Sequence, residues 1–308
     1  MKLRSALLVV GFLTGLFVID RGLASAISLA FERVESGSQA GLVQYAIRQT
    51  DVDVVAFGSS RAALHVDPDV LERELGLTAF NAGAFRQGIR YARAVQAMLL
   101  DRGTRARIFV LHVDPRDLWG TDPRRMQRLA PFYGQNPTVD ALLEDLSPTA
   151  RIKLLLGTYR YNSLLAPILG NLLRDRPGPG NGFQRLPAGR PQDLRPTAEI
   201  VEPGPVLPDM SQLFVDFIEA GRARDVQVVL VDGPRWRPDG MRPMDVIAHE
   251  HFARLSREHG ASYFQIDEVS EPAFQDPDYF HDRAHLTVDG AQLFSRRLAE
   301  RLRPLVAR

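Results

Sequence analysis

Short apolar segments rich in β-branched residues alternate along this chain with longer segments of helical periodicity. Strands are expected at 52–57, 77–81, 106–113, 226–231 and 261–266, and helices at 67–76, 87–100, 210–223, 244–259 and 288–302. Strands that alternate with helices are typical of a parallel sheet covered on both faces. The sequence therefore predicts an α/β fold of three layers (αβα), built on a mainly parallel sheet of about five strands.

The alternation fails between about residues 115 and 206. Arg-rich helical pieces and the Pro- and Gly-rich stretch at 176–182 replace it, which indicates a surface insertion after the third strand. The total of 308 residues is enough for one large domain. We therefore expect one domain over residues 33–308, with a helical and loop insertion at about 115–206.

The first thirty residues carry a membrane-directed pattern. Lys2 and Arg4 precede an apolar run at 6–19, which Asp20 and Arg21 interrupt before a milder apolar stretch. The run is shorter than the ~20 residues of a full span, although its neighbours can extend it. A buried helix of a soluble protein is disfavoured because the run has no polar face.

Two interpretations of this segment remain. Ala24-Ser25-Ala26 resembles the cleavage site of a secretory signal, but two charged residues separate it from the apolar core, which favours an uncleaved anchor. With the basic N-terminus kept in the cytoplasm, residues from about 33 onward lie outside it. We expect residues 1–32 to be a single-pass anchor in the cell inner membrane, with the domain in the periplasm.

Composition excludes several kinds of chemistry. Lys and Arg total 38 against 37 Asp and Glu, and a formal charge of +1 gives no general attraction for nucleic acid, which is not expected as a partner. The chain has no cysteine, so disulfides, a thiol nucleophile and Cys-based metal sites are absent. No metal or other cofactor is expected.

A serine pair follows the first expected strand, in a segment expected to be a loop before the helix at 67–76. Gly58-Ser59-Ser60-Arg61 stands at the carboxyl edge of the sheet, where open α/β folds place their sites. Gly58 permits a tight turn, and a serine there can be an exposed nucleophile whose own backbone N–H faces a developing oxyanion. The alternative is an ordinary turn in which serine is a helix N-cap.

An acid and a base precede the last expected helix. Asp282 and His285 are three residues apart in one loop, so the carboxylate can fix one ring N–H and leave the other ring nitrogen facing a nucleophile. The alternative is a surface loop with two titratable side chains that have no common role.

Together, the two elements resemble the SGNH or GDSL-type esterase superfamily, in which a serine follows the first strand and Asp-x-x-His precedes the last helix. The resemblance covers about 50–114 and 205–303. It implies that Ser60 attacks an acyl carbonyl, that His285 takes and returns the proton, and that Asp282 orients His285. It also implies an SGNH or flavodoxin-like arrangement of the fold.

The middle blocks of the family match less well. The resemblance makes the backbone N–H groups of Ser60 and Gly83, together with Asn81, the oxyanion donors. The third strand is followed by Asp114, where the family usually has an asparagine, and an ionised carboxylate there would repel an oxyanion.

Other polar residues admit two interpretations. Arg61 is expected either to hold a substrate carboxylate or phosphate, or to pair with Asp67 or Asp69. His249 and His251 point about 200° apart on a helix and are expected at the surface rather than on one metal ion.

The resemblance implies a membrane-anchored extracytoplasmic serine esterase or O-acyltransferase that acts through an acyl-serine. The anchor and the Gly-Ser-Ser variant are similar to envelope members such as the alginate O-acetylation proteins and the D-alanyl transfer protein of teichoic acid. The expected partners are an envelope polysaccharide or glycolipid, the inner membrane and a membrane acyl-donor protein. The alternatives are an ordinary α/β-hydrolase and a non-catalytic SGNH-like scaffold of a polysaccharide-modifying complex.

Overall fold

The computed structural model describes residues 2–34, 42–48, 52–173, 180–187, 204–237 and 240–306. Five of its segments pair into one sheet: β1 (Val54–Gly58), β2 (Ala79–Asn81), β3 (Ile108–His112), β4 (Gln227–Asp232) and β5 (Ser262–Gln265). The strand order is β2-β1-β3-β4-β5, and every pair is parallel. The predicted α/β class and the parallel five-stranded sheet are confirmed.

Neighbouring residues of the strands pack into two different cores because successive side chains of a strand point to opposite faces. Val55 and Phe57 of β1 belong to one apolar cluster, together with residues of α5 (Ile89–Asp101) and α9 (Pro208–Arg222). Val54 and Ala56 belong to a second cluster, together with residues of the last helix. The three central strands, β1, β3 and β4, are therefore mainly apolar and buried, which is the pattern of strands covered on both faces.

Three of the remaining helices in the strand-rich part lie near their expected positions, whereas the helices at 42–48 and 60–65 were not expected. These helices are α2 (Leu42–Arg48), α3 (Ser60–His65), α4 (Pro68–Leu75), α10 (Pro243–His259) and α11 (Val288–Val306), with short 3-10 turns η5 (Pro272–Gln275) and η6 (Pro277–Tyr279). Local sequence explains α4: the Asp67 side chain caps its start ahead of Pro68, and Gly76 ends it in the left-handed conformation. The segment expected as a loop after β1 is instead the short helix α3.

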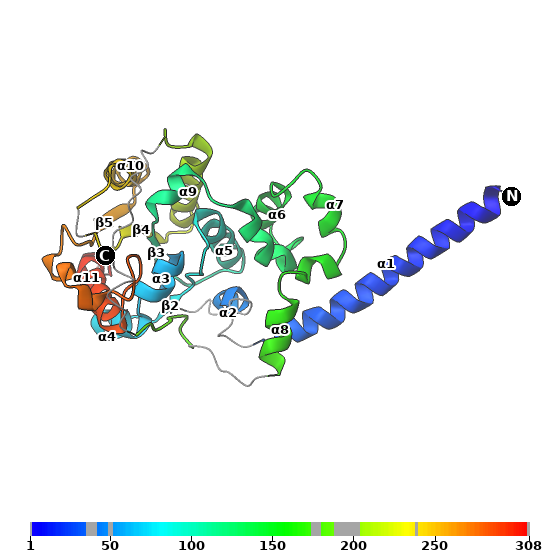
Figure 1. Ribbon diagram of the computed structural model, residues 1–308, viewed down its shortest axis with the longest axis horizontal. Coiled ribbons are helices and arrows are strands. Elements are labelled where there is room, and N and C mark those ends of the chain that lie inside the picture. Colours follow the sequence, from blue (N-terminus) through cyan, green and yellow to red (C-terminus); the bar gives the residue numbers. More distant parts are fainter. Residues whose placement is uncertain are drawn as a thin grey trace.

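A group of short helices connects β3 to α9. It consists of η1 (Pro115–Trp119), η2 (Pro123–Phe132), α6 (Pro137–Glu144), α7 (Ala150–Leu154), η3 (Thr158–Tyr161) and α8 (Leu165–Leu172). Helices α6, α7 and α8 gather at the end of the molecule from which α1 projects (Figure 1). Residues 174–179, with most of the Pro- and Gly-rich stretch, and residues 188–203 lie outside the described part of the chain.

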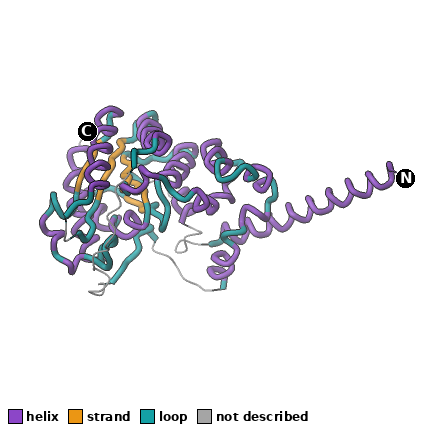
Figure 2. The backbone as a smooth tube through the Cα atoms, turned by 45° about the horizontal axis from the view of Figure 1, so that its top comes forward, coloured by secondary structure: helices purple, strands orange, loops and turns teal. Residues whose placement is uncertain are grey.

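The N-terminal helix α1 (Lys2–Glu32) projects away from the sheet (Figure 2). It is long and apolar enough to cross a membrane, and its most apolar window is not buried by the rest of the chain. Its other end is part of the folded core: Phe31 is buried, with its ring 6.1 Å from that of Phe132 and 5.9 Å from that of Tyr161. The N-terminal part of α1 is therefore an exposed apolar helix, and its C-terminal end packs against the folded domain.

Candidate active site

Ser60 is the first residue of α3, directly beyond the carboxyl end of β1. Ser59 caps this helix by accepting a hydrogen bond from the backbone N–H of Arg61 at 3.3 Å. Gly58 has φ +142°, and a Cβ there would lie 2.6 Å from the backbone oxygen of His112 in β3. The sequence Gly-Ser-Ser therefore combines a turn that only glycine permits, a capping serine and a partly buried serine.

Backbone hydrogen bonds shape the loop that carries Asp282 and His285. Phe280 and Leu286 form an antiparallel bridge with buried side chains, and the N–H of His281 donates to the carbonyl of His285 at 2.9 Å. The Asp282 carboxylate accepts the N–H groups of Ala284 at 2.7 Å and His285 at 3.0 Å. The three-residue spacing thus closes a tight turn that holds the acid beside the base.

The fold brings the serine, the histidine and the aspartate into one chain of hydrogen bonds. The distance from Ser60 Oγ to His285 Nε2 is 2.8 Å, and that from His285 Nδ1 to Asp282 Oδ2 is also 2.8 Å. The proton on Nδ1 is assigned from its carboxylate partner, which leaves Nε2 to accept from the serine hydroxyl. The geometry matches that of a nucleophile, a general base and an orienting acid.

The environment favours the ionised form of Asp282. Burial alone would raise the pKa of this carboxyl, but hydrogen bonds from the His285 ring and the Ala284 backbone hold the pKa below its usual range. The side chain of His285 keeps 24% of its surface exposed. An ionised carboxylate therefore supports a ring that a substrate can reach.

A second serine–histidine pair lies between α9 and α10. Ser211 Oγ is 2.8 Å from His251 Nε2, and the other ring nitrogen, Nδ1, faces the guanidinium of Arg254 at 2.9 Å. Arginine only donates, so Nδ1 must accept and Nε2 must carry the proton. This histidine donates to its serine and does not act as a base toward it.

The structure corrects the oxyanion role expected for Asn81. Its side chain is fully buried and donates to the carbonyls of Ala62 and Val66, both at 2.7 Å, while its Oδ1 accepts the N–H of Gly83 at 2.9 Å. Asn81 and Gly83 thus use their donors inside the protein. Among the described residues, no hydrogen bond uses the backbone N–H of Ser60, the remaining expected donor.

Asp114 stands where an asparagine was expected from the resemblance. Its carboxylate forms a two-pronged pair with the guanidinium of Arg116, at 3.1 and 2.7 Å. Burial would raise the pKa of Asp114, but Arg116 and Arg235 hold it far below its usual range. The carboxylate is therefore ionised, and its charge is matched by arginine.

Arg61 is buried rather than open to a substrate, and it forms its ion pair with Asp232 instead of Asp67 or Asp69. Its side chain is buried and pairs with Asp232 at the end of β4, at 2.9 Å, and it donates to the carbonyls of Val113 and Gly233. Burial lowers the pKa of Arg61 to about 10, so it stays charged at neutral pH. Arg61 therefore ties the start of α3 to the ends of β3 and β4.

His249 is also placed differently from the surface position expected for it. It is buried, and its Nε2 lies 2.7 Å from Asp232 Oδ2. The expectation failed because the helix pattern of α10 does not reveal a buried carboxylate at the end of a strand 17 residues earlier.

Sequence reasoning missed His65, which links the two halves of the candidate site. His65 ends α3, and its Nε2 accepts the backbone N–H of Leu286, next to His285, at 3.2 Å. Burial holds the pKa of His65 well below its usual range, so the ring is neutral and its Nε2 can accept. A histidine five residues after the candidate nucleophile is not a recognisable motif, and only the fold reveals this contact.

The arrangement can therefore perform nucleophilic acyl transfer, with one backbone donor directed by the first turn of α3. No protein-family model and no curated protein matches this chain.

Proposed function

We propose that this protein is a membrane-anchored extracytoplasmic serine esterase or O-acyltransferase of the SGNH type that acts on envelope polysaccharide or glycolipid. The observation that carries the proposal is the chain of hydrogen bonds from Ser60 through His285 to Asp282, with both distances at 2.8 Å. Ser60 and His285 are 225 residues apart in the chain, and Asp282 and His285 are three residues apart. All three lie at the carboxyl edge of the sheet.

Acylation follows from the direction of these hydrogen bonds. Ser60 Oγ attacks the carbonyl carbon of an acyl ester while its proton passes to Nε2 of His285. The ionised Asp282 stabilises the imidazolium that forms, and the N–H of Ser60 donates to the oxyanion. The intermediate then expels the alcohol, which takes the proton from His285, and leaves the acyl group on Ser60.

Deacylation uses the same groups in reverse. His285 accepts a proton from water or from a sugar hydroxyl, whose oxygen attacks the acyl-serine. The intermediate releases Ser60 Oγ, which recovers the proton from His285. Water gives a free acid and hydrolysis, whereas a sugar hydroxyl gives a new ester and transfer.

The finer description of the fold belongs to the same proposal. The two apolar cores on opposite faces of the sheet support a three-layer arrangement. The strand order β2-β1-β3-β4-β5 is that of flavodoxin-like folds, whose sites lie at the end of β1. A serine at that point and Asp-x-x-His before α11 support the SGNH assignment.

Contacts of α1 support an anchor that is retained. The carboxylate of Asp20 accepts hydrogen bonds from the N–H of Gly157 at 2.7 Å and from the N–H and hydroxyl of Thr158 at 3.0 and 2.6 Å. Cleavage at 24–26 would remove this partner together with most of α1. We expect protein extracted from membranes to have the mass of the full chain; a mass beginning near residue 27 would contradict retention.

Turnover of an aryl acetate by the full chain in a non-ionic detergent tests the function. Ser60→Ala and His285→Ala should each lower turnover by at least about 1,000-fold while leaving thermal unfolding unchanged. Ser211→Ala is the matched control, because this serine also lies 2.8 Å from a histidine but has no carboxylate behind it. Equal turnover by the Ser60→Ala variant and the wild type would refute the proposal.

A second candidate function is a non-catalytic SGNH-like scaffold of a polysaccharide-modifying complex. The internal use of the Asn81 and Gly83 donors favours it, because an oxyanion then receives fewer hydrogen bonds. A fluorophosphonate probe separates the two functions: covalent labelling of Ser60 in folded protein supports the enzyme, and its absence supports the scaffold.

A further inference from the structure

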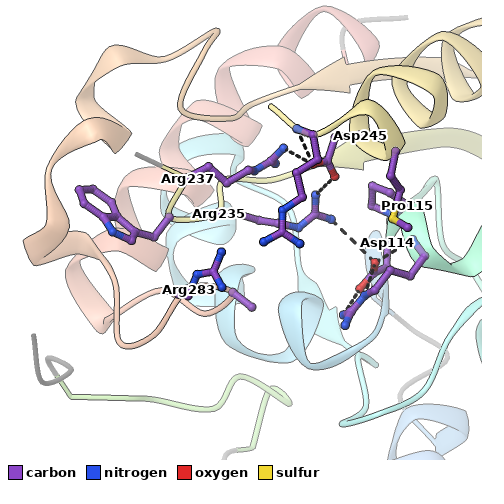
Figure 3. A pocket seen from close by; sticks show the side chains of 11 residues that line it. Asp114, Pro115, Arg235, Arg237, Asp245 and Arg283 are labelled. Atoms are coloured by element: carbon purple, nitrogen blue, oxygen red, sulfur yellow. Dashed lines mark hydrogen bonds and ion pairs between the residues drawn. The ribbon is translucent and has the colours of Figure 1, made fainter. Parts of the chain in front are cut away.

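Five arginines line a cavity beside the candidate active site. The cavity has a volume of about 220 Å³, and its arginines are Arg116, Arg235, Arg237, Arg242 and Arg283. Its two acidic lining residues are Asp114 and Asp245. Figure 3 shows Arg235 and Arg237 converging on Asp245, with Arg283 across the cavity.

Guanidinium groups outnumber carboxylates among the described residues of this cavity. Glu268 pairs with Arg237 at 2.9 Å, which raises the number of carboxylates from two to three against five guanidinium groups. Asp232 pairs with Arg61 at 2.9 Å and also lies 3.5 Å from Arg235. In the part of this cavity that the structure describes, arginines therefore outnumber carboxylates, six against four when Arg61 and Asp232 are both counted.

Two of the guanidinium groups are held in place by protein contacts. Asp245 pairs with Arg235 at 2.8 Å and with Arg237 at 2.7 Å, and the two arginine side chains are 14% and 4% exposed. Burial alone would lower the pKa of Arg235, but Asp232 and Asp114 keep it above its usual value. Fixed, partly desolvated guanidinium groups suit the planar oxygens of a carboxylate or phosphate.

The cavity adjoins the acid and base of the site. Arg283 and Ala284, which line it, lie between Asp282 and His285 in the chain. The N–H of Trp236 donates to the carbonyl of Arg283 at 3.0 Å and joins the β4 loop to this turn. A group bound among the arginines would therefore lie beside the loop that carries the acid and the base.

We propose that this cavity is an anion subsite, which takes the carboxylate or phosphate of the sugar whose ester the site processes. The proposal rests on the proposed function for the identity of the reacting group, but binding itself does not require turnover. The proposal assigns anion recognition to arginines of the β4 and Asp282–His285 loops, and not to Arg61, for which the sequence suggested it.

Calorimetry on the full chain carrying Ser60→Ala, in a non-ionic detergent, tests binding without turnover. The probes are trigalacturonate, its fully methyl-esterified form and glucose 6-phosphate. We expect at least one of the two anions to bind, with an affinity that falls as the salt concentration rises. The esterified trimer should bind at least tenfold more weakly than the anion that binds. Binding of trigalacturonate indicates a uronate, and binding of glucose 6-phosphate indicates a phosphate.

Arg283→Gln and Arg242→Gln should each weaken binding at least tenfold, whereas Arg124→Gln, an exposed arginine outside the cavity, should not. Unchanged binding in both cavity variants, equal binding of the esterified trimer, or no anion binding would overturn the subsite. Anion binding by a chain that lacks esterase turnover would end the proposed function and leave the subsite standing.

A separate observation concerns the exposed apolar side chains around α7. Ile152, Leu155 and Leu156 expose 68%, 56% and 50% of their surface, which is unusual for three large apolar residues in one short segment. Lys153 is exposed beside them. Nothing in the described part of the chain covers these side chains.

This segment is fastened to α1 where its exposed apolar run ends. Asp20 binds the backbone N–H groups of Gly157 and Thr158, and Arg21 donates to the carbonyl of Leu155. From Leu3 to Ile19 the helix rises about 24 Å, which is most of the ~30 Å thickness of a bilayer core. The apolar side chains around α7 therefore lie at the depth at which α1 would leave the bilayer.

We infer that the segment Ile152–Leu156 rests in the outer headgroup region of the bilayer that α1 crosses. Lipid is the occupant that continues the apolar surface of α1, and Lys153 suits anionic headgroups. The inference rests on the proposed anchor but not on the esterase activity.

The absence of cysteine makes single-site labelling direct. Leu156→Cys, Leu13→Cys and Val269→Cys, each carrying bimane, are compared in nanodiscs of phosphatidylglycerol and phosphatidylethanolamine with doxyl-labelled lipid. Leu156 should lose at least half as much fluorescence as Leu13, whereas Val269, exposed near β5, should lose none. Quenching at Leu13 without quenching at Leu156 overturns the inference, and no quenching at Leu13 overturns the anchor as well.

Discussion

Replacement of Asn81 by alanine separates a structural role from an oxyanion role. The variant removes two donors, each 2.7 Å from a carbonyl, and one acceptor, 2.9 Å from the N–H of Gly83. The site is fully buried, so water does not replace these partners. At about 1–3 kcal/mol for each buried group that loses its partner, the free energy of unfolding should fall by at least about 3 kcal/mol. In a domain of this size a loss of about 3 kcal/mol corresponds to a melting temperature about 6–12 °C lower.

The assay combines thermal unfolding of the full chain with fluorophosphonate labelling at a temperature where the variant is folded. We expect a lower melting temperature with labelling of Ser60 largely retained. Asn181→Ala is the control: its amide donates to Asp69 at 2.7 Å from a partly exposed position and should cost less. An unchanged melting temperature together with lost labelling would refute the structural role and restore Asn81 as an oxyanion donor.

Two further predictions follow from buried titratable groups. Burial, with a contribution from the Asp114 charge, raises the pKa of Asp117 from 3.8 to about 8. Between these two pH values the folded state binds more protons than the unfolded state, so the free energy of unfolding falls as the pH rises. Asp117→Asn keeps an acceptor for the N–H of Ile89, and its melting temperature relative to wild type should rise between pH 5 and pH 9; a constant difference would contradict the shift. His65→Phe leaves the N–H of Leu286 unpaired in a buried site and should cost about 1–3 kcal/mol. It should also lower aryl acetate turnover per folded molecule, and His65→Gln should recover part of it; full turnover in the Phe variant would contradict a positioning role.

Periodic and local signals predicted most of the fold. Apolar runs rich in β-branched residues predicted the strands, and the capping residues Asp67 and Gly76 predicted the start and end of α4. The segment Ser60–His65 was expected as a loop because six residues are too few to display an apolar stripe. The Ser60 and His285 motifs were visible because each is contiguous in sequence, and the parallel sheet brings them to one edge.

Long-range polar contacts could not be predicted in the same way. Arg61 and Asp232 are 171 residues apart, and no spacing rule connects the ends of β1 and β4. The arginine cavity likewise collects side chains from the η1, β4 and Asp282 loops. For Asn81, the resemblance supplied a role, but its burial and three internal partners are consequences of packing that a motif does not carry.

The two serine–histidine pairs show why distance alone does not define an active site. Ser60 and Ser211 both lie 2.8 Å from a histidine Nε2. Nδ1 of His285 contacts the carboxylate of Asp282, which can only accept a hydrogen bond. The hydrogen bonds therefore run from serine to histidine to Asp282, and Nε2 of His285 is the basic nitrogen. Nδ1 of His251 contacts the guanidinium of Arg254, which can only donate, so this histidine donates to Ser211 instead of accepting from it. Burial also lowers the pKa of the His251 ring. The group on the far nitrogen therefore decides which serine can become a nucleophile.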